Sequence, residues 1–473
     1  MTRAAPDERS RSRAATAADR DRLVAFGMST AVVARGVGLI APLIITPVCF
    51  RYLGDQRYGL WMAVTALTAM AWFTDLGLGN GLLTRLGQLA DDEKQQAREI
   101  SSAYATVLTV AAVLFGGLLV VNPLIPWADL FGVGDPAIAA EAPILVLMCF
   151  GAFALYMPLS LIQRVQYARG QTVLSNLWQT AGALVSVVGV LAAIAADLSP
   201  LLVVGCAVFA IPLTSAVNNL VFFGLQARSI APRPRLINRA TLTALLRLGL
   251  RFFVLTTFAT VANNLDSPLI ASTLGLEQAA HFALVSKLFA VVTMFVGLVG
   301  MTVWPLNGAA LVDGDVSWVR RNTRRMILLN TVIVAIVGCG LVAWGHEILT
   351  LWVGSADEEL APTAVFGWLA VWTLLIAMAY PMTMAQNSVG LLRPQFIGWL
   401  TFLPLATGMK VWGLHEIGLV AVPAAASLAY LVTMIPAVII GYRRTLRDFG
   451  RLGRRPAPTT PSPSDPGGHP DAP

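Results

Sequence analysis

Charged residues are scarce in this chain. Only 12% of its 473 residues are Asp, Glu, Lys or Arg, whereas 56% are hydrophobic. A typical soluble domain carries about 25% charged residues, so this composition cannot cover a water-facing surface. Because lipid must be the solvent for most of the chain, we expect an all-α integral membrane protein.

Cysteine, histidine and recognisable catalytic motifs are also scarce. The four cysteines and four histidines are scattered. The sequence has no CxxC pair, His-Glu-x-x-His motif, nucleophile elbow or phosphate-binding glycine loop. This spacing argues against a structural zinc site. We therefore expect no metal, no cofactor and no catalytic residue, which favours a function other than catalysis.

Long apolar runs are abundant instead, and runs of about 20 or more residues predict membrane-spanning helices. They form a first bundle at 23–225 and a second bundle at 246–442, joined by a cytoplasmic linker at 226–245. A polar cytoplasmic tail at 1–22 precedes them, and the Pro-, Ser- and Gly-rich tail 443–473 is expected to be disordered. The twelve expected spans are 24–50, 59–84, 101–124, 139–163, 173–196, 199–225, 246–273, 281–308, 326–346, 361–388, 395–414 and 416–441.

Basic residues gather on one side of the predicted bundles, in both tails, the linker and alternate loops. The loops of the other side carry only Arg51 and Arg57 of the 33 Lys and Arg residues. The positive-inside rule then predicts a multi-pass protein of the cell inner (plasma) membrane with both termini cytoplasmic. No nucleic-acid partner is expected, because the basic residues are dispersed over short loops and tails.

The two halves of the chain resemble each other at a fixed offset, which indicates an internal repeat. Leu53-Gly54 corresponds to Leu274-Gly275 at an offset of 221, and the stretch 163–171 echoes 386–395 at an offset of 223–224. Six spans per repeat predict two pseudo-symmetric bundles of the same orientation, with a substrate cavity between them.

Arg35 is the one charged residue between Leu23 and Phe50. A charge at mid-span costs at least about 2.5–3.5 kcal/mol, and Arg35 lies roughly 12–18 Å inside its predicted helix. Its side chain either reaches back to the cytoplasmic headgroups or lines a water-filled cavity. The second interpretation makes Arg35 a candidate substrate-binding residue.

Other polar residues inside predicted spans are further candidates. Asp75 either pairs with Arg35 or takes part in transport, and Asp266 with Lys287 is a possible equivalent pair in the second bundle. Lys410 is expected to reach outward to the membrane surface. Candidate substrate-binding residues besides Arg35 are Lys287, Arg251, Asn263 and Asn264, with Asp75 and Asp266 as coupling or charge-pair residues.

Three motifs in the first hundred residues resemble a known family. They are the segments Ala34-Arg-Gly-Val-Gly, Arg51-Tyr-Leu-Gly-Asp-Gln-Arg-Tyr-Gly-Leu-Trp and Thr74-Asp-Leu-Gly-Leu-Gly-Asn-Gly. Together they resemble the polysaccharide-transporter, or O-antigen flippase, family within the multidrug, oligosaccharidyl-lipid and polysaccharide exporters. The resemblance implies about twelve transmembrane helices in two six-helix bundles around a central cavity.

The resemblance also implies a substrate and a direction. An undecaprenyl-diphosphate-linked oligosaccharide would pass from the cytoplasmic to the outer leaflet for surface polysaccharide biosynthesis, by alternating access. Family members hold the diphosphate with cationic cavity residues, and Arg35 falls where such a residue is expected. The expected partners are this lipid-linked substrate and membrane lipids, with a polysaccharide polymerase and export machinery as further candidates.

Three other functions are weighed at this point. A major-facilitator carrier would also have twelve spans, but the loop after the second span, Leu83-Thr-Arg-Leu-Gly-Gln-Leu-Ala-Asp-Asp, lacks that group's Gly-x-x-x-Asp-Arg-x-Gly-Arg pattern. A drug or cation antiporter on the same fold would need carboxylates in its cavity, and span 1 of this chain contains none. An integral-membrane enzyme of polymer assembly would need a long external loop or domain, and every predicted external loop is short.

Overall fold

Every regular element in the described part of the structure is helical. The computed structural model describes residues 8–70, 79, 82–83, 85–86, 89, 92–238, 243, 260–261, 264–312, 314–354 and 360–452. Side chains are described for these residues except 8–35, 39, 298–306, 309, 312 and 450–452. The expectation of an all-α protein is confirmed.

The helices follow the predicted apolar runs. In the first half they are α1 (Glu8–Met70), α3 (Glu93–Val121), α4 (Trp127–Leu130), α5 (Pro136–Leu159), α6 (Leu161–Ala168), α7 (Thr172–Ala195) and α8 (Pro200–Val221). In the second half they are α10 (Asp266–Leu274), α11 (Leu276–Val312), α12 (Val316–Val353), α13 (Thr363–Asn387), α14 (Arg393–Ile417) and α15 (Ala421–Leu452).

Nine segments of the described chain are long and apolar enough to cross a membrane. One of them, Arg393–Phe449, contains α14 and most of α15. The count of twelve spans stays a prediction, since most of the expected span 246–273 lies outside the described residues. One expectation was wrong: α15 continues to Leu452, so 443–452 is helical and does not belong to a disordered tail.

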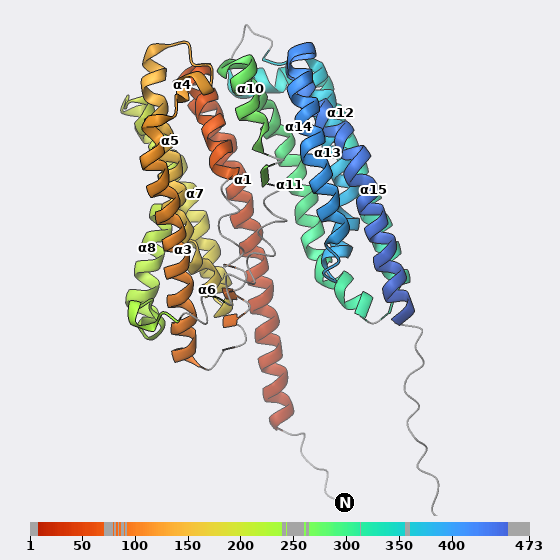
Figure 1. Cartoon of the computed structure of the whole chain (residues 1–473). Helices are drawn as coiled ribbons and strands as arrows, with labels where there is room; N and C mark the ends of the chain where they lie inside the picture. The colour runs from red at the N-terminus through yellow and green to blue at the C-terminus, as the bar shows by residue number, and fades with distance from the viewer. Residues whose placement is uncertain are drawn as a thin grey trace, which may run out of the picture.

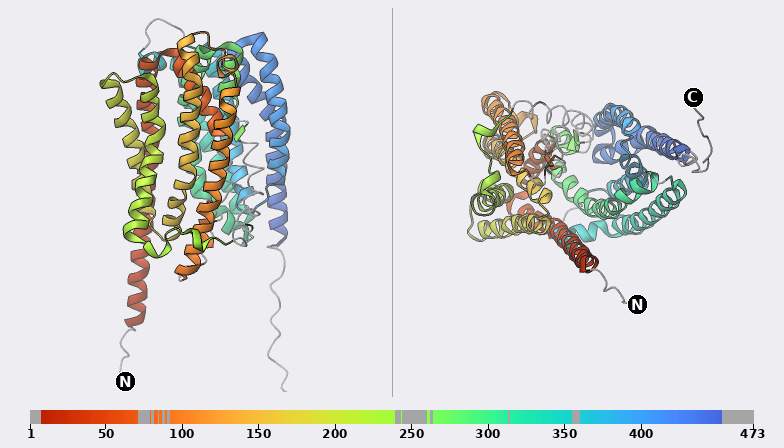
Figure 2. Two further views of the ribbon diagram at one scale, coloured as in Figure 1. Left: turned by 60° about the vertical axis from the view of Figure 1, so that its left-hand side comes forward. Right: turned by 90° about the horizontal axis from the view of Figure 1, so that it is seen from below.

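The helices form two groups that stand side by side (Figures 1 and 2). Helices α3 to α8 lie on one side and α10 to α15 on the other, and α1 packs against α7 and α11 between them. The first residues of α1 and the last residues of α15 lie at the same end of the molecule (Figure 1). We call the opposite end, where α4 and α10 lie, the distal end.

Backbone breaks reveal the internal repeat more clearly than sequence identity does. Gly54 interrupts α1 with φ 74° and ψ 169°, and Gly275 separates α10 from α11 with φ 94° and ψ 169°. This conformation is accessible almost exclusively to glycine. Eight of the nine positive-φ residues in the described chain form corresponding pairs, namely Gly54 with Gly275, Gly132 with Gly354, Gly170 with Gly390, and Asp197 with Gly418; Gly314 is the ninth and belongs to no pair.

These pairs give offsets of 220 to 222 between the halves, which corrects one part of the predicted alignment. Near Gly170 and Gly390 the offset is 220, so Gln386 corresponds to Gln166 and not to Gln163. Both glutamines are fully buried and donate a side-chain hydrogen bond to the last helix of their half. Gln166 donates to Asn218 Oδ1 at 2.8 Å, and Gln386 donates to the Val438 carbonyl at 3.0 Å.

The two halves approach each other closely near the distal end. Gly59 of α1 approaches the Leu276 carbonyl so closely that a Cβ there would lie 1.9 Å from the oxygen. Trp352 Nε1 donates to the Leu43 carbonyl at 2.8 Å, and Arg51 Nε donates to the Val353 carbonyl. These contacts close the distal end between the two groups of helices.

We predict that Gly54→Ala lowers thermal stability, because a Cβ at this φ and ψ costs about 1–3 kcal/mol. The matched control is Gly117→Ala, since Gly117 is exposed in α3 and has open space around it. Alanine at that position should be neutral or slightly stabilising. Unfolding temperatures in detergent would measure the difference. Equal unfolding temperatures for the two variants would contradict the conclusion that the backbone at Gly54 requires glycine.

Candidate functional site

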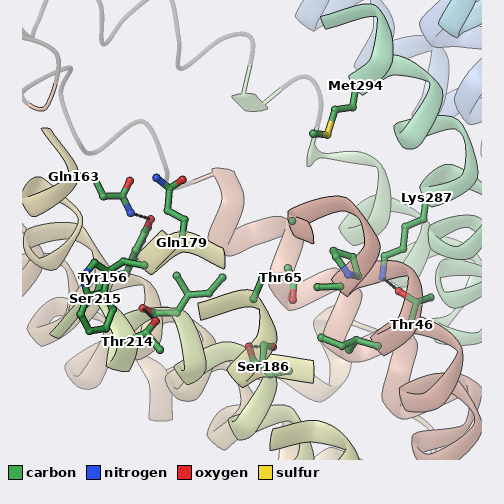
Figure 3. A pocket seen from close by; sticks show the side chains of 18 of the residues that line it. Thr46, Thr65, Tyr156, Gln163, Gln179, Ser186, Thr214, Ser215, Lys287 and Met294 are labelled. Carbon is green, nitrogen blue, oxygen red and sulfur yellow. Dashed lines mark hydrogen bonds between the residues drawn. The ribbon is translucent and has the colours of Figure 1, made fainter. Parts of the chain in front are cut away.

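A cavity of about 590 Å³ lies between the two groups of helices (Figure 3). It falls within the range of about 300–1,000 Å³ that is usual for small-molecule sites. Most of its wall comes from the first half, and Lys287 and Met294 of α11 reach it from the second half. Its polar and aromatic lining includes Thr46, Trp61, Thr65, Tyr156, Gln163, Trp178, Gln179, Ser186, Thr214, Ser215 and Asn218.

Lys287 binds two neutral oxygens of α1. Its ammonium donates to Thr46 Oγ1 at 2.8 Å and to the Tyr58 hydroxyl at 2.7 Å, and it lies 5.2 Å from the centre of the Tyr58 ring. Twelve residues of continuous helix would separate Thr46 from Tyr58 by about 18 Å. Their shared contact with one nitrogen therefore demonstrates that the chain folds back on itself at Gly54.

The charge of Lys287 has no acidic partner among the described residues. The four ion pairs of this part of the chain involve other residues, and no Asp or Glu is found among the described residues that line the cavity. An ammonium has three donors, and Thr46 and Tyr58 account for two. A half-buried cation held by neutral oxygens in this way favours an anion in the cavity.

A second cavity of about 460 Å³ is lined mostly by the second half, including Asn264 and Asp266, with Ala66 from the first half. Asp266 forms an ion pair with Lys410 of α14, whose side chain is only 3% exposed. Two expectations are corrected here. Asp266 pairs with Lys410 and not with Lys287, and Lys410 is buried where an outward-reaching side chain was predicted, because this carboxylate stabilises its charge inside the bundle.

Asn264 has a local role in the described structure. Its Nδ2 donates to the Thr260 carbonyl of the preceding turn at 2.8 Å. Four other predicted site residues are not described at the level of their side chains. They are Arg35, whose backbone belongs to α1, and Asp75, Arg251 and Asn263, which lie outside the described residues.

Sequence reasoning missed Thr46 and Tyr58, the two partners of Lys287. A signal for Thr46 is present, because Thr46-Pro47 and Ser267-Pro268 occupy equivalent positions at the offset of 221. Thr46 lines the first cavity and Ser267 lines the second. Tyr58 has no such signal, since its equivalent in the second half is Ala279.

The sequence pattern of a known family covers much of this chain. Residues 25–306 match the family described as polysaccharide biosynthesis protein. The chain belongs to this family. No curated protein sequence matches it, so the family pattern and the solved structures carry the comparison.

Solved structures with the same fold include a multidrug transporter and a lipid flippase. The inward-facing conformation of a multidrug resistance MATE family transporter of the MOP superfamily matches with a TM-score of 0.73 and 13% identity, over 90% of this chain and 100% of that one. The lipid II flippase MurJ in an inward closed conformation matches with a TM-score of 0.68 and 12% identity, over 91% and 90%. This member of the polysaccharide biosynthesis family thus shares its fold with that transporter and with the flippase.

We predict that Asp266 and Lys410 stabilise the second half as a pair. Asp266→Asn or Lys410→Met alone leaves one buried charge without its partner, at a cost of about 3–5 kcal/mol. The double variant removes both charges and should recover much of that loss. Unfolding temperatures of the four proteins in detergent form a double-mutant cycle, and strictly additive effects would contradict the pairing.

Proposed function

We propose that this chain flips an undecaprenyl-diphosphate-linked oligosaccharide from the cytoplasmic to the outer leaflet during surface polysaccharide biosynthesis. The observation that carries the proposal is the Lys287 ammonium, bound by two neutral hydroxyl oxygens in the central cavity. It acts as a positive point charge for the diphosphate. The hydroxyl and amide groups of the cavity wall suit the sugar, whose hydroxyls both donate and accept hydrogen bonds.

Arg35 is the proposed second cation of the site. On α1, the residues that line the cavity include Gly38, Pro42, Ile45 and Thr46, which share one helix face by their spacing. Position 35 continues this face toward the N-terminus, one turn before Gly38. A guanidinium on this face would offer two phosphate oxygens a matching pair of donors.

The membrane orientation supplies a driving force for the proposed direction. With both termini cytoplasmic, as the distribution of basic residues predicts, the closed distal end faces outward and the cavity receives substrate from inside. Two negative charges that move outward across an inside-negative membrane gain roughly 5 kcal/mol per 100 mV. In this proposal the chain has no catalytic role. It provides a path by which the diphosphate-linked sugar headgroup crosses the membrane.

The drug or cation antiporter is the weaker candidate on the same fold. Such a function calls for a carboxylate that is free to bind a cation. Among the described lining residues of the two cavities, Asp266 is the one acid, and Lys410 already neutralises it.

We predict that Lys287→Gln reduces flipping about ten- to hundredfold, which corresponds to the loss of one charge-assisted hydrogen bond. Lys287→Arg should retain part of the activity because it keeps the charge. The measurement is surface polymer output, together with lipid-linked intermediate accumulated inside, in cells that depend on this protein. Lys94→Gln, an exposed lysine outside the cavity, is the matched control, and immunoblots establish equal protein levels. Normal output from Lys287→Gln with altered drug efflux would favour the antiporter.

Arg35 gives a separate prediction. Arg35→Ala should lower polymer output and Arg35→Lys should restore part of it, because a lysine keeps the charge but not the paired donors. If both variants make polymer at the normal rate, Arg35 has no part in substrate binding. Of the two proposed cations, Lys287 would then be the one that binds the diphosphate.

A further inference from the structure

Three side chains that are distant in the sequence converge close to the two glycine breaks. Asp55 directly follows Gly54 in α1, and Glu277 and His281 lie four residues apart on one face near the start of α11. Each offers one ligand atom, a carboxylate oxygen or a ring nitrogen, and these three atoms lie within 4.8 Å of one another. The Asp55 carboxylate therefore meets Glu277 and His281 across the boundary between the halves.

The histidine of this cluster has an unsatisfied nitrogen. His281 is only 3% exposed, and its Nε2 is buried without a hydrogen-bond partner in the described structure. A buried polar atom in this state is unfavourable, because it has lost its hydrogen bonds to water and gained none in the protein. No ion pair of His281 with either carboxylate is present in the described part of the chain, so the acids do not satisfy the ring at the separation observed.

We propose that Asp55, Glu277 and His281 bind a divalent transition-metal ion of the zinc class. Imidazole nitrogen with carboxylate oxygens is a donor set that suits Zn²⁺, whereas Ca²⁺ and Mg²⁺ favour oxygen ligands alone. In a tetrahedral site with ligand distances of about 2.0–2.2 Å, the donor atoms stand about 3.3–3.6 Å apart. A small closing movement brings the three atoms to the ion, and a fourth position remains for water.

The ion would join the two halves at the distal end. Asp55 belongs to the first half, while Glu277 and His281 belong to the second, and the Gly59 to Leu276 contact lies beside them. A chain of side-chain contacts also connects the His281 ring to the central cavity. Its centre lies 6.4 Å from that of Phe50, which packs edge-on against Tyr58 at 5.4 Å, and Tyr58 binds Lys287. Metal occupancy thus stabilises the distally closed state.

The test is Zn²⁺ binding to the purified full-length protein in detergent, prepared with a tag that contains no histidine. Calorimetry should detect one Zn²⁺ per chain, and Zn²⁺ should raise the unfolding temperature. Asp55→Asn, Glu277→Gln and His281→Gln should each weaken binding by at least about tenfold and abolish the thermal shift. Asp129→Asn, an exposed acid in α4, and His415→Gln on α14 are matched controls that should behave as wild type.

Co²⁺ serves as a spectroscopic probe of the same site. Visible ligand-field bands should appear in the wild-type protein and disappear in the three variants. Zn²⁺ affinity that is unchanged in Glu277→Gln would overturn the proposal, and this variant is decisive because Glu277 is exposed and its substitution leaves the packing intact. If the control variants lose as much Zn²⁺ affinity as the three site variants, the binding is adventitious surface binding. That result would also overturn the proposal. The outcome is independent of the transported substrate.

Discussion

The structure depends on one ammonium group shared by two neutral oxygens. Lys287 of α11 holds Thr46 and Tyr58, which lie on either side of the Gly54 break in α1. The same three groups fold α1 back on itself, join the two halves and leave a positive charge at the central cavity. Removing water from such a cation is costly unless an anion replaces it, so the fold and the proposed substrate chemistry share one physical origin.

The two halves have kept their backbone geometry and lost their equivalence in charge. Positive-φ breaks recur at offsets of 220 to 222, yet Lys287 corresponds to Ala66. The pair of Asp266 and Lys410 corresponds to Ile45 and Gly189 in the first half. Positive φ favours glycine strongly, and Asp197 is the one other residue type found there in the described chain. Residues that face a cavity are constrained instead by what they bind. The repeat can therefore be recognised from the positive-φ turns, but not from the charged residues of the cavities.

Much of the fold could be predicted from the sequence, and less of the site. Apolar runs predict helices because lipid leaves the backbone no other partner, and Leu53-Gly54 with Leu274-Gly275 located the repeat. The partner of Asp266 could not be predicted, because Lys410 is 144 residues away and its position near a helix end suggested an outward-reaching side chain. Asp55 and His281 likewise become neighbours only after α1 and α11 pack together, so no spacing rule identifies their cluster.

The crossed placement of Lys287 has a consequence for how such a transporter can diversify. Lys287 belongs to the second half but lines the first cavity, and its counterpart Ala66 belongs to the first half but lines the second. Each half thus contributes a lining residue to the cavity that is formed mostly by the other half. Exchanging both residues, Lys287→Ala together with Ala66→Lys, would move the positive charge from the first cavity to the second and leave every glycine break in place.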